Sequence, residues 1–192
     1  MDERARTALD RLEAGNVRFA QGRMLNRFAS QERAASVAGQ RPFAVVVGCS
    51  DSRVPVEAVF DAGVGELFVV RTAGHVLAAA SLASIRFAVE KLGAPLVLVL
   101  GHEDCGAVSA ALSGETAEWL APILSHIDVS DIDVSKAPDD ADDPLLGAAV
   151  DSHVRDTVAE LERFIMPFAP SVAVAGAAYR LASGRVHWLS GD

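Results

Sequence analysis

The sequence predicts an α/β fold with a mostly parallel central β-sheet flanked by helices. Three short apolar runs, residues 43–49, 67–70 and 96–100, are rich in Val and Leu and nearly free of polar residues. Such runs are typical of strands that are buried on both faces of a sheet. Residues 78–92, between the second and third runs, have helical composition, and an alternation of buried strand and helix indicates parallel strands.

The remaining segments fit the same architecture. Apolar residues recur at helical spacing over residues 7–23, although Gly15-Asn16 interrupts the pattern and predicts a bend or a division of this helix. Residues 1–38 are therefore expected to form an N-terminal helical arm, which packs on its own domain or on a partner. Further along the chain we expect helices at 104–112 and 145–164, a strand at 172–180, and a return strand at 185–189 that completes one edge of the sheet.

Length and charge limit the classes of protein that remain. A chain of 192 residues with 51% hydrophobic residues is long enough for one packed domain, so residues 1–192 are taken as a single domain. The formal net charge is −9, and much of the acidic excess lies in residues 128–144, which we expect to form an Asp-rich surface insert. This balance argues against a nucleic-acid partner, because phosphate binding needs clustered Lys and Arg.

The sequence also bears on the location of the protein and on the role of its cysteines. We find no apolar stretch long enough to cross a bilayer and no signal peptide, so we expect a cytoplasmic protein without a membrane partner. The two cysteines are Cys49 and Cys105. In a cytoplasmic chain such thiols are more often metal ligands or catalytic groups than a disulfide, with inert core cysteines as the alternative.

Three potential metal ligands follow predicted strands. Cys49 ends the first strand, and His102 and Cys105 follow the third. Because functional sites form beyond the carboxyl ends of parallel strands, Cys49 faces the other two residues if these strands are neighbours. The spacing of His102 and Cys105 places both on one side of a helical turn. Two thiolates and one imidazole suit zinc, and three protein ligands leave a position for water, as in catalytic zinc sites. The other histidines lack this context and are given no metal role: His75, His126, His153 and His187.

These motifs resemble those of the β-class carbonic anhydrases. Residues 49–53, Cys-Ser-Asp-Ser-Arg, match the family's CxDxR motif, and residues 102–105, His-Glu-Asp-Cys, match its HxxC motif. Segments 15–19, 65–74 and 176–179 are also similar, so the resemblance covers nearly the whole chain. It implies reversible, zinc-dependent hydration of carbon dioxide to bicarbonate and a proton by a zinc-bound hydroxide.

The resemblance also implies roles for single residues. Cys49, His102 and Cys105 become the zinc ligands. Asp51 and Arg53 become a catalytic dyad, in which Asp51 accepts a hydrogen bond from the hydroxide and Arg53 keeps Asp51 ionised and oriented. In a closed form found in some members, Asp51 moves onto the zinc as a fourth ligand and displaces the water.

The substrate pocket implied by the resemblance contains Gln40, Phe68 and Phe87. Gln40 matches a residue that donates a hydrogen bond to bound bicarbonate, and the two Phe residues align with positions that line the carbon dioxide pocket. Ordinary core packing would account equally well for both rings. In the family this pocket forms at a dimer interface, so we expect a homodimer or a dimer of dimers in which Gln40 and Phe87 serve the neighbouring subunit's zinc.

One departure from the family pattern concerns regulation. Members with a bicarbonate regulatory site typically have Trp three residues before the first Cys ligand, and this chain has Val46 there. Arg71 and Tyr179 match the other two residues of that site. We therefore expect bicarbonate to act mainly as product.

Three alternative functions fit part of the pattern. A structural zinc module would need a fourth permanent ligand, and it leaves Arg53 and Gln40 unexplained. A thiol redox protein would need a close CxxC pair, whereas Cys49 and Cys105 lie far apart in the sequence. A hydrolase of carbonyl sulfide or carbon disulfide on the same scaffold would share the catalytic motifs, so the motifs alone do not reject it.

Overall fold

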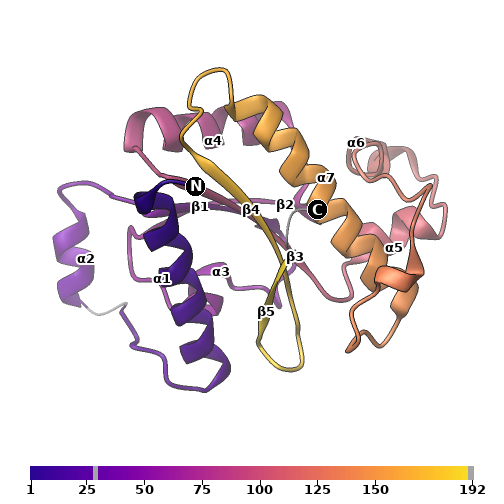
Figure 1. Ribbon diagram of the computed structural model, residues 1–192, viewed down its shortest axis with the longest axis horizontal. Coiled ribbons are helices and arrows are strands. Elements are labelled where there is room, and N and C mark those ends of the chain that lie inside the picture. The colour runs from indigo at the N-terminus through magenta and orange to yellow at the C-terminus, as the bar shows by residue number, and fades with distance from the viewer. Residues whose placement is uncertain (28–29, 190–192) are drawn as a thin grey trace.

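The computed structural model describes residues 1–27 and 30–189, and a five-stranded β-sheet forms its centre (Figure 1). The strands are β1 (Ala44–Cys49), β2 (Leu67–Thr72), β3 (Leu96–His102), β4 (Ala173–Tyr179) and β5 (Val186–Leu189). They are arranged in the order β2-β1-β3-β4-β5. The pairs among the first four strands are parallel, and β5 is antiparallel to β4 at one edge. The expected sheet and its C-terminal edge strand are confirmed.

Helices lie on both faces of this sheet (Figure 1). Alternate residues of β1 and β3 point to opposite faces, so Val46 and Leu98 contact one core and Val45 and Val97 the other. The helix α1 packs in the first core, and α4 and α7 pack in the second. The α-helices are α1 (Glu3–Ala20), α2 (Ser30–Ser36), α3 (Val56–Val59), α4 (Ala79–Leu92), α5 (Gly106–Leu112), α6 (Ala121–Leu124) and α7 (Pro144–Ile165), and the 3₁₀ helices are η1 (Ala73–His75), η2 (Glu118–Leu120) and η3 (Val134–Lys136).

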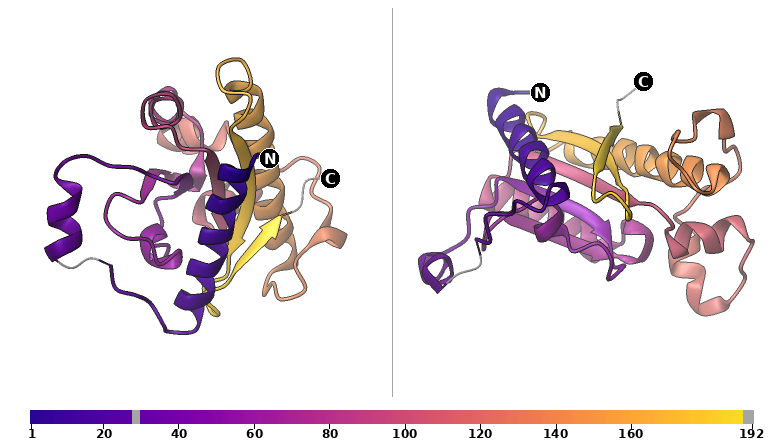
Figure 2. Two further views of the ribbon diagram at one scale, coloured as in Figure 1. Left: turned by 60° about the vertical axis from the view of Figure 1, so that its left-hand side comes forward. Right: turned by 90° about the horizontal axis from the view of Figure 1, so that it is seen from below.

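The N-terminal arm divides into two parts with different environments. Helix α1 packs on its own domain, where Ala8 and Leu12 are buried in the core. In contrast, α2 stands apart from the sheet on an extended segment (Figure 2). The sequence pattern did not predict α2, whose residues carry no apolar stripe.

Helix α1 is continuous through Gly15 and Asn16, so the helix is not divided there. Gly15 lies against the carbonyl of Phe60, where a Cβ would not fit. The Asn16 amide donates to the carbonyls of Val59 (3.2 Å) and Gly184 (2.9 Å), and its oxygen accepts the Val186 N–H at 2.8 Å. The interruption in the apolar pattern therefore marks a buried polar contact between α1, α3 and the β4–β5 hairpin.

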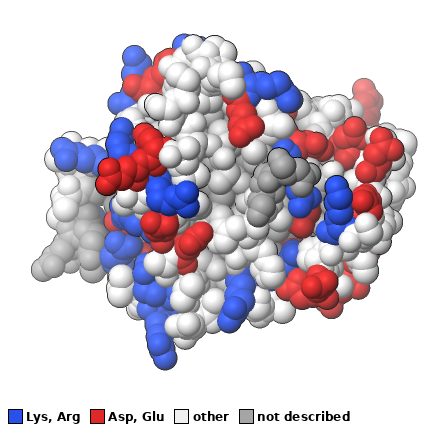
Figure 3. Space-filling model, in the orientation of Figure 1, with Lys and Arg blue, Asp and Glu red and all other residues white. Residues whose placement is uncertain are grey.

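Most residues of the Asp-rich segment 128–144 are exposed or half-buried, and several of its carboxylates have local structural roles. Asp133 accepts the Ser135 N–H at the start of η3, and Asp143 caps α7 by accepting two backbone N–H groups. Asp140 accepts from Arg180 at 3.1 Å, which ties the insert to the end of β4. Acidic side chains gather on this side of the molecule, over α5, α6 and the start of α7 (Figure 3). Among the described residues, no helix combines the length and hydropathy needed to span a membrane.

Candidate metal centre and catalytic site

The carboxyl ends of β1 and β3 bring Cys49, His102 and Cys105 together. These strands are parallel neighbours, which was the condition for Cys49 to face His102 and Cys105. Cys49 ends β1, His102 ends β3, and Cys105 immediately precedes α5. All three side chains are buried, and their candidate ligand atoms lie within 4.8 Å of one another. The cluster predicted from the sequence is therefore present in one chain.

The imidazole of His102 is oriented for metal binding. Its Nδ1 lies 2.8 Å from the Glu103 carbonyl, which can only accept, so Nδ1 carries the proton. Within the described part of the chain, the buried Nε2 has no hydrogen-bond partner. An Nδ1–H bonded to a carbonyl is the usual support of a metal-binding histidine, because it fixes the tautomer and the ring orientation. The unpartnered Nε2, with two sulfur atoms beside it, fits the donor set of a zinc ion.

The two thiols strongly influence each other. A hydrogen bond from Cys105 lowers the pKa of Cys49 to about 4, against the opposing effect of burial, and the Gly74 N–H also contributes to the lowering. The same neighbour and burial raise the pKa of Cys105 above its ordinary value. The pair thus retains one shared proton in the metal-free chain. A cation at this position would favour both thiolates by replacing that proton.

Asp51 and Arg53 form a close ion pair next to this cluster. The Arg53 guanidinium donates from Nη2 to Asp51 Oδ2 at 2.7 Å and from Nε to Oδ1 at 3.0 Å, and the Arg53 backbone N–H donates to Oδ1 at 2.8 Å. These contacts lower the pKa of Asp51 to about 2, so its carboxylate is ionised. Asp51 Oδ2 lies 3.9 Å from His102 Nε2. A charged acceptor is therefore held beside the potential metal position.

Two further contacts around the dyad were not foreseen from the sequence. Arg53 Nη1 donates to Asp104 Oδ2 at 3.0 Å, so Asp104 fixes the side of the guanidinium that faces away from Asp51. Arg71 donates to the carbonyls of Cys49 (2.8 Å) and Asp51 (2.6 Å) and so supports the backbone of both residues. The position of Asp104 inside the HxxC motif was the only available signal for its role.

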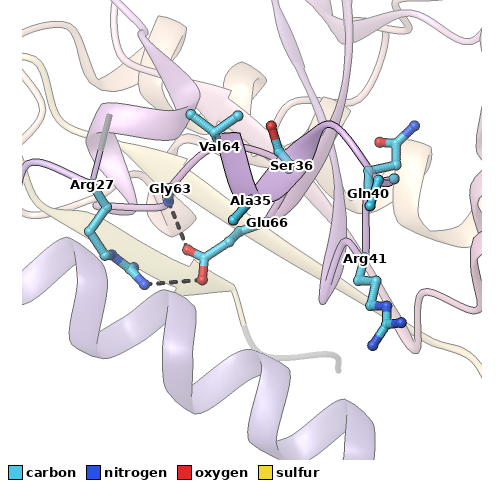
Figure 4. Close-up of a pocket in the computed structure, with 11 residues that line it drawn as sticks. Arg27, Ala35, Ser36, Gln40, Arg41, Gly63, Val64 and Glu66 are labelled. Carbon is cyan, nitrogen blue, oxygen red and sulfur yellow. Dashed lines mark hydrogen bonds and ion pairs between the residues drawn. The ribbon is translucent and has the colours of Figure 1, made fainter. Parts of the chain in front are cut away.

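Gln40 lies away from the metal cluster of its own chain. It is exposed in the segment between α2 and β1, where it lines a surface cavity of about 600 Å³ (Figure 4). Its neighbours there include Arg27, Gly65 and Glu66, which precede β2 or lie at its amino end. The cluster lies at the opposite, carboxyl ends of the strands. One chain therefore does not place Gln40 beside the predicted ligands.

Phe68 and Phe87 form an apolar pair at the edge of the sheet. Their ring centroids are 6.4 Å apart, and Phe87 on α4 is 49% exposed. Phe68 lies on β2 opposite Val45, near the start of β1, whereas Cys49 ends that strand. In the described residues no further strand pairs with the outer edge of β2. The two rings thus form part of an open surface rather than a closed pocket within the chain.

Comparisons with known proteins agree with one another. The carbonic anhydrase family profile matches residues 44–186. A carbonic anhydrase of Mycolicibacterium smegmatis is 42% identical over 190 residues, which cover 93% of this chain and 90% of that protein. The β-carbonic anhydrase CafA of Aspergillus fumigatus has a similar structure, with a TM-score of 0.70 and 24% identity over 96% of this chain and 90% of that one. A structure described as a tetrameric β-carbonic anhydrase of Sordaria macrospora gives a TM-score of 0.65 and 21% identity over 97% and 96% of the two chains.

Proposed function

The chain belongs to the β-carbonic anhydrase family, and on this premise we propose that it hydrates carbon dioxide reversibly with a zinc ion bound by Cys49, His102 and Cys105. The observation that carries the proposal is the buried cluster, in which His102 Nε2 has no partner among the described residues and lies close to two thiols. Zinc bound there would supply a Lewis acid that lowers the pKa of a coordinated water toward ~7 and so provides hydroxide at ordinary pH.

Asp51 orients the attacking oxygen in this proposal. Because its pKa is about 2, the carboxylate is ionised and can only accept hydrogen bonds. It therefore accepts the hydrogen of the attacking oxygen and leaves a lone pair directed at the carbon of the substrate. Arg53, held in turn by Asp104, keeps the carboxylate in place and charged.

The contacts of Asp51 bear on the open and closed forms. Both of its oxygens accept hydrogen bonds from Arg53, which supports an open form with the fourth metal position left to water. A closed form, with Asp51 as the fourth ligand, would require these bonds to be exchanged for a bond to the metal. We propose that the open form is the active one.

We also propose that a second copy of the chain completes the substrate pocket. Three features support this assembly: Gln40 is remote from its own cluster, Phe87 is exposed, and β2 has an open edge in the described residues. In a homodimer or a dimer of dimers, Gln40 and Phe87 would line the other subunit's site, with Phe68 beside them. We further propose a cytoplasmic location, where a reducing environment keeps both ligand thiols available.

The proposal is tested by metal analysis of the purified protein together with a stopped-flow assay of carbon dioxide hydration. We expect about one zinc per chain and an activity that disappears when a chelator removes the metal and returns when zinc is added back. A zinc-loaded protein without hydration activity would overturn the proposed reaction, and an active protein without bound metal would overturn the proposed cofactor.

A further inference from the structure

His153 is a buried histidine in the middle of α7 that the proposed reaction does not use. Its Nε2 lies 2.8 Å from the carbonyl oxygen of Gly74 in η1. Its ring stacks on that of His75, with centroids 4.3 Å apart and an angle of 28° between the planes. The long helix and the short turn behind the metal cluster are thus joined by a hydrogen bond and a ring contact.

The η1 turn directs a backbone N–H at a predicted metal ligand. The N–H of Gly74 donates to Cys49 Sγ at 3.3 Å. Gly74 and His75 both have positive φ angles, 61° and 47°, and for His75 this left-handed conformation is unfavourable. A Cβ on Gly74 would lie 2.9 Å from that of Ala107, so the turn is closely confined. Such a conformation persists only where the surroundings fix it.

The hydrogen-bonding pattern indicates what a histidine contributes at position 153. The Gly74 carbonyl can only accept, so Nε2 of His153 carries the proton and donates it. In the described part of the chain, Nδ1 of His153 and both nitrogens of His75 have no partner. An apolar side chain would pack here without leaving buried nitrogens unpaired. An apolar side chain could therefore supply the packing at this position, and what a histidine adds is the N–H donor at Nε2.

We propose that His153 is a positioning residue for the metal centre, holding the η1 turn so that the Gly74 N–H stays bonded to Cys49 Sγ. The inference rests on the proposed zinc site. A hydrogen bond to a thiolate withdraws electron density from the sulfur and fixes its direction, and partners of this kind tune both metal affinity and ligand geometry. His153 acts through Gly74 and does not touch the metal or the substrate.

The test compares His153→Gln with His153→Met in the full-length protein loaded with cobalt(II). The two side chains have nearly the same shape, but only Gln has an amide N–H that can replace Nε2–H. We expect the thiolate-to-cobalt charge-transfer band of the Gln variant to match that of the wild type. In the Met variant this band should move to longer wavelength, and metal affinity in a chelator competition should fall on the order of ten- to hundredfold.

A control separates positioning from general loss of stability. Leu161→Ala removes a fully buried side chain from the same helix, remote from the turn. It should destabilise the fold yet leave the band where it is. Identical bands in the Met variant and the wild type would overturn the inference while leaving the zinc site intact. A wild-type chain that binds neither cobalt nor zinc would overturn the proposed site and the inference with it.

A measurement on the unmodified protein keeps the inference testable if the Met variant does not fold. Hydrogen exchange of the Gly74 amide in the zinc-loaded wild type reports its bond to Cys49 directly. We expect protection comparable to that of the central strands. Exchange as fast as that of an exposed loop amide would overturn the inference.

Discussion

The two ends of the central sheet differ in how much of the site one chain provides. At the carboxyl ends of β1 and β3, Cys49, His102 and Cys105 form a buried cluster with most of its supporting hydrogen bonds within the chain. At the amino end of β2, Gln40 lines an open cavity and is exposed to solvent. On the proposed function, the metal site would lie within a single chain, whereas the substrate pocket would depend on assembly.

The largest losses of bound metal and of activity should come from substitutions in the cluster at the carboxyl ends of β1 and β3. Cys105→Ala or His102→Ala removes one of the three proposed ligands, and the remaining two would not hold zinc well against water. We expect loss of bound metal and of hydration activity, measured by elemental analysis after gel filtration and by stopped-flow assay. Full zinc occupancy in Cys105→Ala would show that the ligand assignment is wrong.

Changes in the dyad should separate metal binding from catalysis. Asp51→Asn removes the charge of the acceptor, and Arg53→Ala removes the group that orients it. Both variants should retain zinc, whereas kcat/KM for hydration should fall on the order of 10²-fold or more, as is usual when a positioned proton acceptor is lost. Near-normal kcat/KM with full zinc content would mean that the pair only supports the fold.

Complementation between two variants can test whether Gln40 serves the site of the other subunit. Gln40→Ala should lower kcat/KM about tenfold, the effect of losing one hydrogen bond to an anion. Mixed dimers of Gln40→Ala and Cys105→Ala chains contain one subunit with an intact cluster and one with an intact Gln40. If Gln40 serves the other subunit, these dimers recover one fully active site for each pair. Failure to recover it in dimers of verified composition would place Gln40 in the site of its own chain.

A smaller effect concerns the stability of the fold in acid, which should depend on the buried histidines His75 and His153. Burial lowers the pKa of both His75 and His153 below 6.5, so the unfolded chain binds protons in mild acid that the folded chain does not. The free energy of unfolding should therefore decrease as pH falls below 6.5, by about 1.4 kcal/mol per pH unit for each histidine. His102, whose pKa is raised, is protonated in both states in this range and adds no slope.

Urea unfolding of the metal-free protein at several pH values measures this decrease. His153→Gln removes one of the two groups and should flatten the slope. An unchanged slope in this variant would show that His153 does not titrate between the folded and unfolded states. Cys49 adds a slope of the same sign, because its pKa is lowered from 9.0 to about 4 on folding and only the unfolded thiol is protonated at these pH values. This slope is common to the wild type and the variant, so the difference between them reports on His153. Asp51, whose pKa is lowered from 3.8 to about 2, adds slope only in stronger acid.

The strands and the metal cluster could be predicted because their signals are local. Valine-rich runs identify buried parallel strands, and polar residues at the ends of such strands meet at one edge. The segment that ends at Cys49 and the segment that ends at His102 are therefore enough to locate the cluster from the sequence alone. The return strand was recognisable from the Ser183-Gly184 turn that precedes it.

The contacts that the sequence did not reveal depend on distant partners. Asn16 appeared to break a helix, because nothing near it in the sequence reveals its contacts with Val59 and Val186. Arg71 supports the backbone of Cys49 through geometry that only the folded sheet defines. His153 lies on a helix whose pattern identifies a buried face but gives no sign of the left-handed turn that it meets.

The order of the strands also affects how the protein is made. The proposed ligands lie at the end of β1 and at or just after the end of β3, and β2 and α4 lie between these two strands in the chain. In turn, β3 is covered on its other side by β4, close to the C-terminal end of the described chain. A chain growing from its N-terminus thus presents both thiols well before it can enclose them. We expect metal capture to be a late step of biosynthesis and the nascent chain to be the form most vulnerable to thiol oxidation.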